Sequence, residues 1–190
     1  LTGRRIVVQE HGQSLSMVAH ALRRQGAQVQ NVTVYRVISA EDPAPMSSFT
    51  RDLRALLRAP YSIIQVETHE EARCVELLHR LAAADHRPVW EWSPTRGFNG
   101  QEESANLLHA FDAIASSEAM GIFIFKDAAP MLEDMVLRRR LRELEPICAG
   151  SHKTLVFVGP HRITHLELQK EITRKAMPLP GRTAIRTACE

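Results

Sequence analysis

The sequence predicts an α/β fold, with a mostly parallel sheet flanked by helices on both faces. Short apolar runs alternate with longer stretches of helical periodicity along the 190 residues. This alternation is typical of βαβ units joined by right-handed crossovers. Two of the runs, GIFIFK at 121–126 and KTLVFV at 153–158, have the continuous apolar character of strands buried inside a sheet.

The first 48 residues are predicted to form one βαβ unit. A short strand over 6–8 is followed by an amphipathic helix over 15–24. Gly26 stands where a helix C-cap glycine belongs, and a second strand covers 29–37. Residues 39–48, SAEDPAPMSS, combine proline, serine and acidic residues without periodicity. This composition predicts a linker.

The remaining elements are predicted from the same periodicities. A helix over 49–58 places Phe49, Leu53, Leu56 and Leu57 at helical spacing. The later elements are strand 61–67, helix 69–84, strand 88–92, loop 93–101, helix 102–117, strand 121–126, helix 133–148, strand 153–158 and a strand near 173–179.

The predicted domain organisation has three parts. Residues 1–48 form the βαβ unit, 49–182 the larger α/β domain and 183–190 a tail. Strand 29–37 also fits the edge of the larger sheet, because the linker is short. In that arrangement the two domains would be one.

Composition favours a soluble, cytoplasmic protein. The formal net charge is +2 and the pI about 8.6, too mild an imbalance to indicate nucleic-acid binding by itself. Cys74, Cys148 and Cys189 lie far apart and fit no C-x-x-C pattern. We therefore expect reduced thiols and no zinc site. No apolar run approaches the ~18 residues of a membrane span, so we expect no membrane partner.

The sequence lacks a phosphate-binding loop. The pattern G-x-x-x-x-G-K-S/T, whose backbone N–H groups and lysine hold phosphates, occurs nowhere in the chain. In a nucleotide-binding core it would follow strand 61–67, where Thr68, His69, Glu70 and Glu71 stand instead. We expect Thr68 to cap the next helix and the glutamates to lie at its positive end. A phosphate there would meet two carboxylates, so we expect no nucleotide and no other cofactor.

Several separated runs carry a family resemblance over about 50–182. They are LRALLRAPYSIIQVETHEEARCVELLHRL, RPVWEWSPTRGF, GIFIFKDAAPMLED, RRRLREL, KTLVFVGP and ELQKEIT followed by MPLP. This region resembles the N-terminal, pre-motor region of the cyanobacterial and plastid-type AAA ATPases. The resemblance implies a degenerate P-loop-NTPase-like core without a Walker A loop, placed before an ATPase domain that lies outside it. Lys126 and Asp127 would end its Walker-B-like strand, where an active ATPase holds Mg²⁺. The alternative is a polar pair at a strand end.

A second resemblance covers about 1–50. LTGRRIVVQEHG, ALRRQGAQVQNVTVYRV and EDPAP are similar to part of uroporphyrinogen-III synthase. That enzyme of tetrapyrrole (haem) biosynthesis closes a linear tetrapyrrole between two α/β domains and needs no metal or cofactor. The resemblance implies that Tyr35 and Arg36 would face a tetrapyrrole cleft.

The strand PVWEW and the loop after it combine a candidate contact site with core residues. The loop SPTRGFNG follows the strand PVWEW and carries Arg96, Gly97 and Asn99, where a ligand or partner contact is expected. Trp90 and Trp92 alternate with Glu91 in that strand, so we expect both indoles on one face of the sheet, packed in the core.

The densest basic run lies in helix 133–148. It consists of Arg138, Arg139, Arg140 and Arg142, with glutamates interspersed. One interpretation is a solvated helix face whose charges are balanced by Glu143 and Glu145. The other is a patch for an acidic partner or a phosphate backbone. No aromatic residues are interleaved to support nucleic-acid stacking.

The pattern of chemistry-bearing residues favours a module without catalysis. There is no G-x-S-x-G, the H-E-x-x-H pattern fails at Arg73, and Cys74 and Cys148 lie in apolar helical contexts. We expect no catalytic residue and no metal site. The favoured function is an accessory or regulatory module that acts through contacts with an AAA ATPase domain or another protein. The alternatives are a uroporphyrinogen-III synthase-like lyase, incomplete in this chain, and a fused or decayed product without activity.

Overall fold

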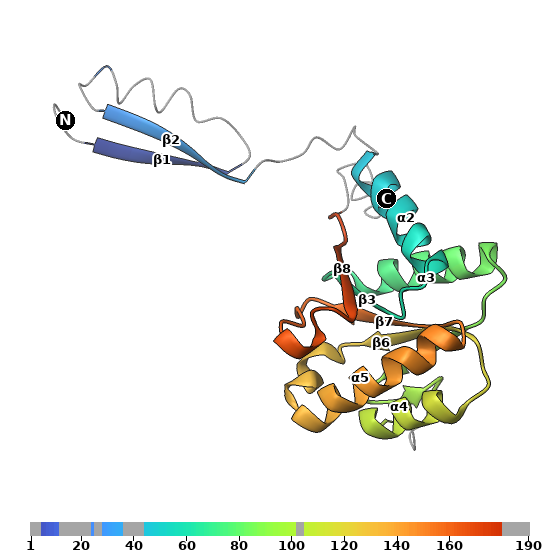
Figure 1. The fold of residues 1–190 in the computed structure, drawn as a ribbon. Helices are drawn as coiled ribbons and strands as arrows, with labels where there is room; N and C mark the ends of the chain where they lie inside the picture. The colour runs from blue at the N-terminus through green and yellow to red at the C-terminus, as the bar shows by residue number, and fades with distance from the viewer. Residues whose placement is uncertain (1–4, 12–23, 25–27, 36–43, 102–104, 180–190) are drawn as a thin grey trace. The chain divides into compact units, whose positions relative to one another are not determined.

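The computed structural model describes residues 5–11, 24, 28–35, 44–101 and 105–179. They belong to two units, one containing the strands before residue 36 and one spanning Ala44–Leu179. Within the described ranges, every helix is too short or too polar to cross a lipid bilayer. Figure 1 shows the elements of both units.

The N-terminal unit contains a sheet of two parallel strands, β1 (Arg5–His11) and β2 (Gln28–Tyr35). Parallel pairing is the arrangement expected of a βαβ unit. These two strands pair with each other in a two-stranded sheet. The predicted helix over 15–24 and its cap at Gly26 lie outside the described residues, except for Arg24, which is helical.

The larger unit is built on a six-stranded sheet in the order β5-β4-β6-β7-β3-β8. Every neighbouring pair is parallel except β4 and β5, which form an antiparallel hairpin. The strands are β3 (Ile63–Glu67), β4 (Val89–Ser93), β5 (Gly97–Phe98), β6 (Gly121–Lys126), β7 (Lys153–Gly159) and β8 (Ile172–Ala176). The predicted α/β class with a mostly parallel sheet is confirmed.

Helices cover both faces of this sheet (Figure 1). The helical elements are α2 (Ala44–Arg58), α3 (Glu71–Ala84), α4 (Leu107–Ser116), the 3-10 turn η2 (Ala129–Glu133), α5 (Met135–Gly150) and the 3-10 turn η3 (Leu166–Leu168). Side chains alternate between faces along a strand. Accordingly, Ile122 and Ile124 of β6 pack with α2 and α3, whereas Phe123 and Phe125 pack with α4 and α5.

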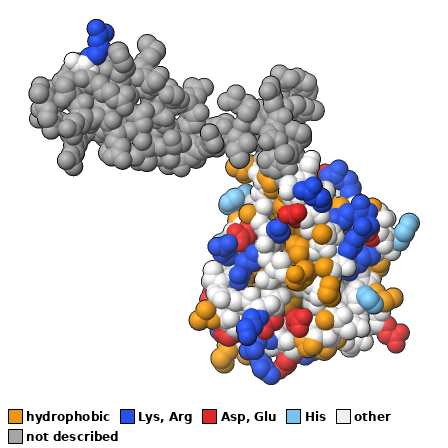
Figure 2. Space-filling view, turned by 45° about the horizontal axis from the view of Figure 1, so that its top comes forward, with side chains coloured by type: hydrophobic (Ala, Val, Ile, Leu, Met, Phe, Trp, Pro, Cys, Tyr) orange, Lys and Arg blue, Asp and Glu red, His pale blue; other side chains and the backbone are white. Residues whose placement is uncertain are grey.

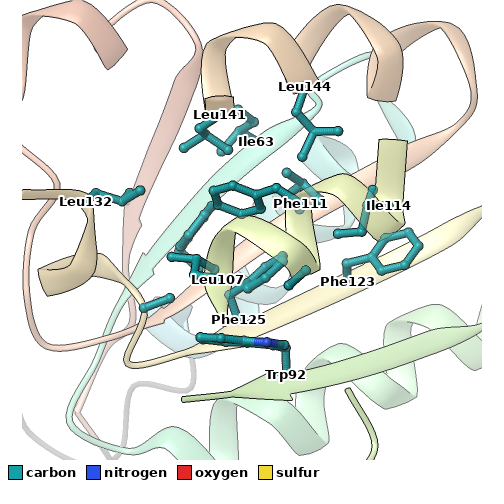
Figure 3. Packing of buried hydrophobic residues seen from close by; sticks show 14 of the residues in the cluster. Ile63, Trp92, Leu107, Phe111, Ile114, Phe123, Phe125, Leu132, Leu141 and Leu144 are labelled. Atoms are coloured by element: carbon teal, nitrogen blue, oxygen red, sulfur yellow. The ribbon is translucent and has the colours of Figure 1, made fainter. Parts of the chain in front are cut away.

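Aromatic rings fill the core on the α4 and α5 side (Figure 3). Phe125 is completely buried and stacks on Phe157 with ring centroids 5.2 Å apart. Trp92 and Phe111 lie at 5.5 and 5.6 Å from the same ring. Trp90 stacks on Phe123, so the two tryptophans share one face of the sheet as predicted.

The start of α2 and the predicted loop 93–101 differ from the sequence prediction for identifiable reasons. Helix α2 begins at Ala44, so the predicted linker over 39–48 is too long. Pro45 does not prevent this start, because a proline in the first turn removes no helical hydrogen bond. The predicted loop 93–101 contains the strand β5, which pairs Gly97 with Ser93 in a hairpin too short to give a periodic signal.

Helices α4 and α5 begin later than predicted, at Leu107 and Met135. In each case a side-chain cap sets the start. Asn106 accepts from the backbone N–H groups of Leu108 and His109, and Asp134 accepts from that of Val136. Such caps occupy the residue just before the first helical position.

Candidate functional site

The strand order of the larger unit creates a switch point between β7 and β3. The chain leaves β3 toward β4 on one side of the sheet, and it leaves β7 toward β8 on the other. In open α/β sheets, ligands bind outside the carboxyl ends of the strands at such a point. The loops after Glu67 and Gly159 are therefore the first place to look for a nucleotide site.

This crevice is closed by hydrogen bonds between the two loops. The Thr68 N–H donates to the Gly159 carbonyl at 3.1 Å. The buried Gln65 side chain donates to the His161 carbonyl at 2.7 Å and accepts from the Ile163 N–H at 3.1 Å. The N–H groups of Thr68 and Ile163 and the carbonyls of Gly159 and His161 are thus already paired within the protein.

The connection from β3 to α3 leaves no room for a phosphate-binding loop. Only residues 68–70 separate Glu67 from the helix start at Glu71, whereas the G-x-x-x-x-G-K-S/T pattern needs about eight positions. Glu70 forms an ion pair with Arg73 and stands at the helix N-terminus with Glu71. The acidic character of this helix end agrees with the sequence prediction.

Thr68 does not cap α3, contrary to prediction. The helix begins at Glu71 with Glu70 as the preceding residue, and no side chain caps it. The Thr68 hydroxyl instead accepts from the Glu70 N–H at 2.9 Å. Threonine hydroxyls make such local turns as readily as caps, so the sequence alone did not distinguish the two.

Lys126 ends β6 and Asp127 follows it directly, and the two side chains lie in different surroundings. Asp127 is exposed, adopts a left-handed φ of 50°, and donates its N–H to the Val158 carbonyl. The ammonium of Lys126 lies 2.6 Å from a carboxylate oxygen of Glu91 in β4. A second oxygen, on Glu71, lies 3.9 Å from it. Lys126 therefore belongs to an ion-pair network with Glu91 and Glu71 near the strand ends.

Glu91 is the centre of this network. One of its oxygens binds Lys126 and the other lies 2.6 Å from His79 Nε2 on α3. Burial raises the pKa of Glu91, but the hydrogen bonds from Lys126 and His79 outweigh it and hold the pKa below its ordinary value. Alternation in β4 indicated that Glu91 faces away from the tryptophans. Its partners come from distant elements and had no sequence signal.

The predicted contact loop is a structured hairpin. Asn99 has a φ of 48°, donates its N–H to the Glu91 carbonyl and accepts from the Glu91 N–H through its side chain. Gly97 is buried with a φ of 59°, as a tight turn requires. Arg96 is exposed. Asn99 and Gly97 thus shape the hairpin, and Arg96 and Asn99 are both exposed to solvent.

The four arginines of α5 all have acidic neighbours. Arg138 lies near Glu167 at 3.3 Å, Arg139 near Glu143 at 2.7 Å, Arg140 near Asp112 at 2.6 Å and Arg142 near Glu171 at 3.6 Å. This arrangement favours the interpretation as a balanced, solvated face. A phosphate backbone would have to displace these carboxylates.

The remaining predicted sites receive less support from the structure. Tyr35 ends β2 opposite His11, whereas Arg36 lies outside the described residues. In the part of the chain that the structure describes, no cluster of histidine, cysteine, aspartate and glutamate could hold a metal ion. Cys74 and Cys148 are buried, and burial raises the pKa of each thiol to about 12.

Asp85, which follows α3, is a site that sequence analysis missed. The guanidinium of Arg58 on α2 binds the Asp85 carboxylate in a bidentate way: Nε donates to Oδ2 at 2.8 Å and Nη2 donates to Oδ1. Arg54 Nη2 also donates to Oδ1, at 3.0 Å. Hydrogen bonds from Arg58 and Arg54 hold the pKa of this carboxyl far below its ordinary value. These hydrogen bonds connect α2 to the end of α3.

Replacing Asp85 with asparagine should change how stability depends on pH. A depressed folded-state pKa contributes stability that is present above the unfolded pKa of ~3.9 and is lost as pH falls toward the folded value. The wild-type chain should therefore exceed Asp85→Asn in unfolding free energy at pH 7, and the gap should shrink at pH 3. Urea titrations at both pH values measure it. A gap that is equal at both would contradict the ion pair.

A match to a known protein family identifies the larger unit. The model of the SpoVK-like AAA ATPase N-terminal domain matches residues 49–177, most of the larger unit. The chain belongs to this family. The predicted resemblance to the pre-motor region of AAA ATPases is thereby confirmed. None of the matches supports the resemblance of residues 1–50 to uroporphyrinogen-III synthase.

Curated relatives point to the same AAA family. The chain is 30% identical to an uncharacterized AAA domain-containing protein, ycf46, of Pyropia yezoensis over 142 residues, which is 70% of the chain and 29% of that protein. Identity to the ycf46 protein of Guillardia theta is 30% over 148 residues, covering 73% and 29%. The chain thus spans less than a third of the length of these relatives.

Proposed function

We propose that residues 44–179 act as a non-catalytic accessory module of an AAA protein, through contacts with an ATPase domain, and do not bind nucleotide themselves. The observation that carries this proposal is the short β3–α3 connection. It has no phosphate-binding loop, and the acidic groups of Glu70 and Glu71 stand where phosphates would lie. The hydrogen-bonded crevice beside it supports the same conclusion.

Titration with ATP and with ADP in the presence of Mg²⁺ tests the proposal. We expect no saturable heat in calorimetry and no shift of the thermal unfolding midpoint, because a ligand that binds the folded state raises its stability. Saturable micromolar binding would contradict the proposal. Binding that disappears in Asp127→Ala would place the nucleotide at the end of β6.

A pull-down with an isolated AAA ATPase domain tests the partner. The expected result is saturable capture of the ATPase domain by the chain. An unrelated folded protein of similar size and net charge, immobilised in the same amount, is the control for non-specific adhesion. Absence of capture by AAA ATPase domains would contradict the proposed partner while leaving the nucleotide result unaffected.

A further inference from the structure

A groove of about 840 Å³ lies between α2 and α3. Four arginines line it: Arg51, Arg54 and Arg58 from α2, and Arg80 from α3. Leu77 and Leu81 also line it, but they are only 3% and 8% exposed because they belong to the core. Among the residues that the structure describes, no acidic side chain lines the groove. In Figure 2, which brings the α2 side of this unit forward, Lys and Arg side chains flank a band of hydrophobic ones.

The arginines of this groove differ in whether they already bind a carboxylate within the protein. Arg54 and Arg58 bind the carboxylate of Asp85 at the end of α3. Arg51 and Arg80 are exposed, and among the described residues neither lies within ion-pair distance of a carboxylate. The nearby Asp52 is held by Lys175 at 2.9 Å. The groove therefore keeps an excess of positive charge.

Spacing along α2 places the basic groups in one row. Arg51, Arg54 and Arg58 are separated by three and four positions, so they lie on one face of the helix. The fork that Arg58 makes on Asp85 shows the geometry in which this row binds a carboxylate. A row of arginines along a helix is complementary to a helical segment that carries carboxylates.

We infer that this groove binds an acidic helix of a partner protein, with carboxylates of that helix on Arg51 and Arg80. The inference rests on the proposed function, since an accessory module acts through such a surface. A protein segment fits better than RNA, because no aromatic side chain in the described part of the chain lines the groove for base stacking.

Fluorescence anisotropy with a labelled model peptide tests the inference. The probe is a helix of about 15 residues with leucine and glutamate at helical spacing, and the same peptide with lysine for glutamate is its counterpart. The full chain is compared with Arg51→Glu/Arg80→Glu and with Arg51→Gln/Arg80→Gln. Both residues are exposed, and thermal unfolding checks that each variant is folded. Lys170→Glu is the matched control, an exposed charge reversal outside the groove.

The expected result is saturable binding of the acidic peptide alone, weakened about tenfold or more by the double charge reversal and less by the glutamine variant. Lys170→Glu should leave the affinity within about twofold, and added salt should weaken it. Absence of binding would overturn the inference, and so would an affinity for the acidic peptide that is equal in the wild-type chain and the double variants. Tighter arginine-dependent binding of a single-stranded oligo-uridylate would also overturn it, in favour of a nucleic-acid partner. Each of these outcomes is independent of the ATP titration.

Discussion

Phe125→Ala should destabilise the larger unit by about 3–5 kcal/mol. Phe125 is completely buried at the middle of the sheet, and the rings of Phe157, Trp92, Phe111 and Phe98 surround it at centroid distances of 5.2 to 5.9 Å. Removing the ring leaves a cavity that four rigid neighbours cannot fill, in addition to the lost hydrophobic burial.

Urea unfolding followed by far-ultraviolet circular dichroism measures this loss as a shift of the midpoint. Met120→Ala is the matched control, because Met120 is 58% exposed and its truncation should change stability by less than ~0.5 kcal/mol. A loss below about 1 kcal/mol for Phe125→Ala would contradict the aromatic packing described above.

The second large effect is expected for Gly121→Ala, at about 2–5 kcal/mol. Gly121 begins β6 with a φ of 142°, a conformation that residues with a Cβ rarely adopt. An added Cβ would lie 2.4 Å from the Pro88 carbonyl oxygen and 2.7 Å from the Trp90 ring. Since the carbonyl belongs to the backbone, relief of this clash requires β4 and β6 to move apart.

Gly150→Ala provides the comparison at another glycine of the same unit. A Cβ at Gly150 meets no atom within 4 Å, and the residue ends α5. The substitution should be neutral or stabilise by a few tenths of a kcal/mol, because alanine loses less backbone entropy on folding. Equal urea midpoints for Gly121→Ala and Gly150→Ala would show that the strand start is not constrained as described.

Strand and helix identity over the larger unit was readable from periodicity. The runs at 121–126 and 153–158 are buried strands, and the face on which Trp90 and Trp92 lie followed from alternation. Helix starts were less predictable. Asn106 and Asp134 cap their helices, but several polar residues precede each helix, and only backbone geometry selects among them.

The candidate site was predictable where it depended on local sequence and unpredictable where it depended on pairing. The missing phosphate loop and the acidic start of α3 were visible in the sequence. The Glu91 network and the ion pairs of Asp85 with Arg54 and Arg58 join residues from separate elements. Their formation depends on strand order, which local patterns do not specify.

The sequence by itself thus determined the α/β class, the absence of a phosphate-binding loop and the family resemblance, because each is encoded in short runs of residues. Only the tertiary structure decided where charges are satisfied. Lys153 shows the difference, since a lysine before an apolar strand suggests a solvent-exposed start. It is 4% exposed, and its ammonium donates to the Ile114 and Ser117 carbonyls at 2.8 and 2.5 Å. Those carbonyls lie at the end of α4, where the helix dipole favours a cation. The partners of a charge are thus set by the packing of distant elements.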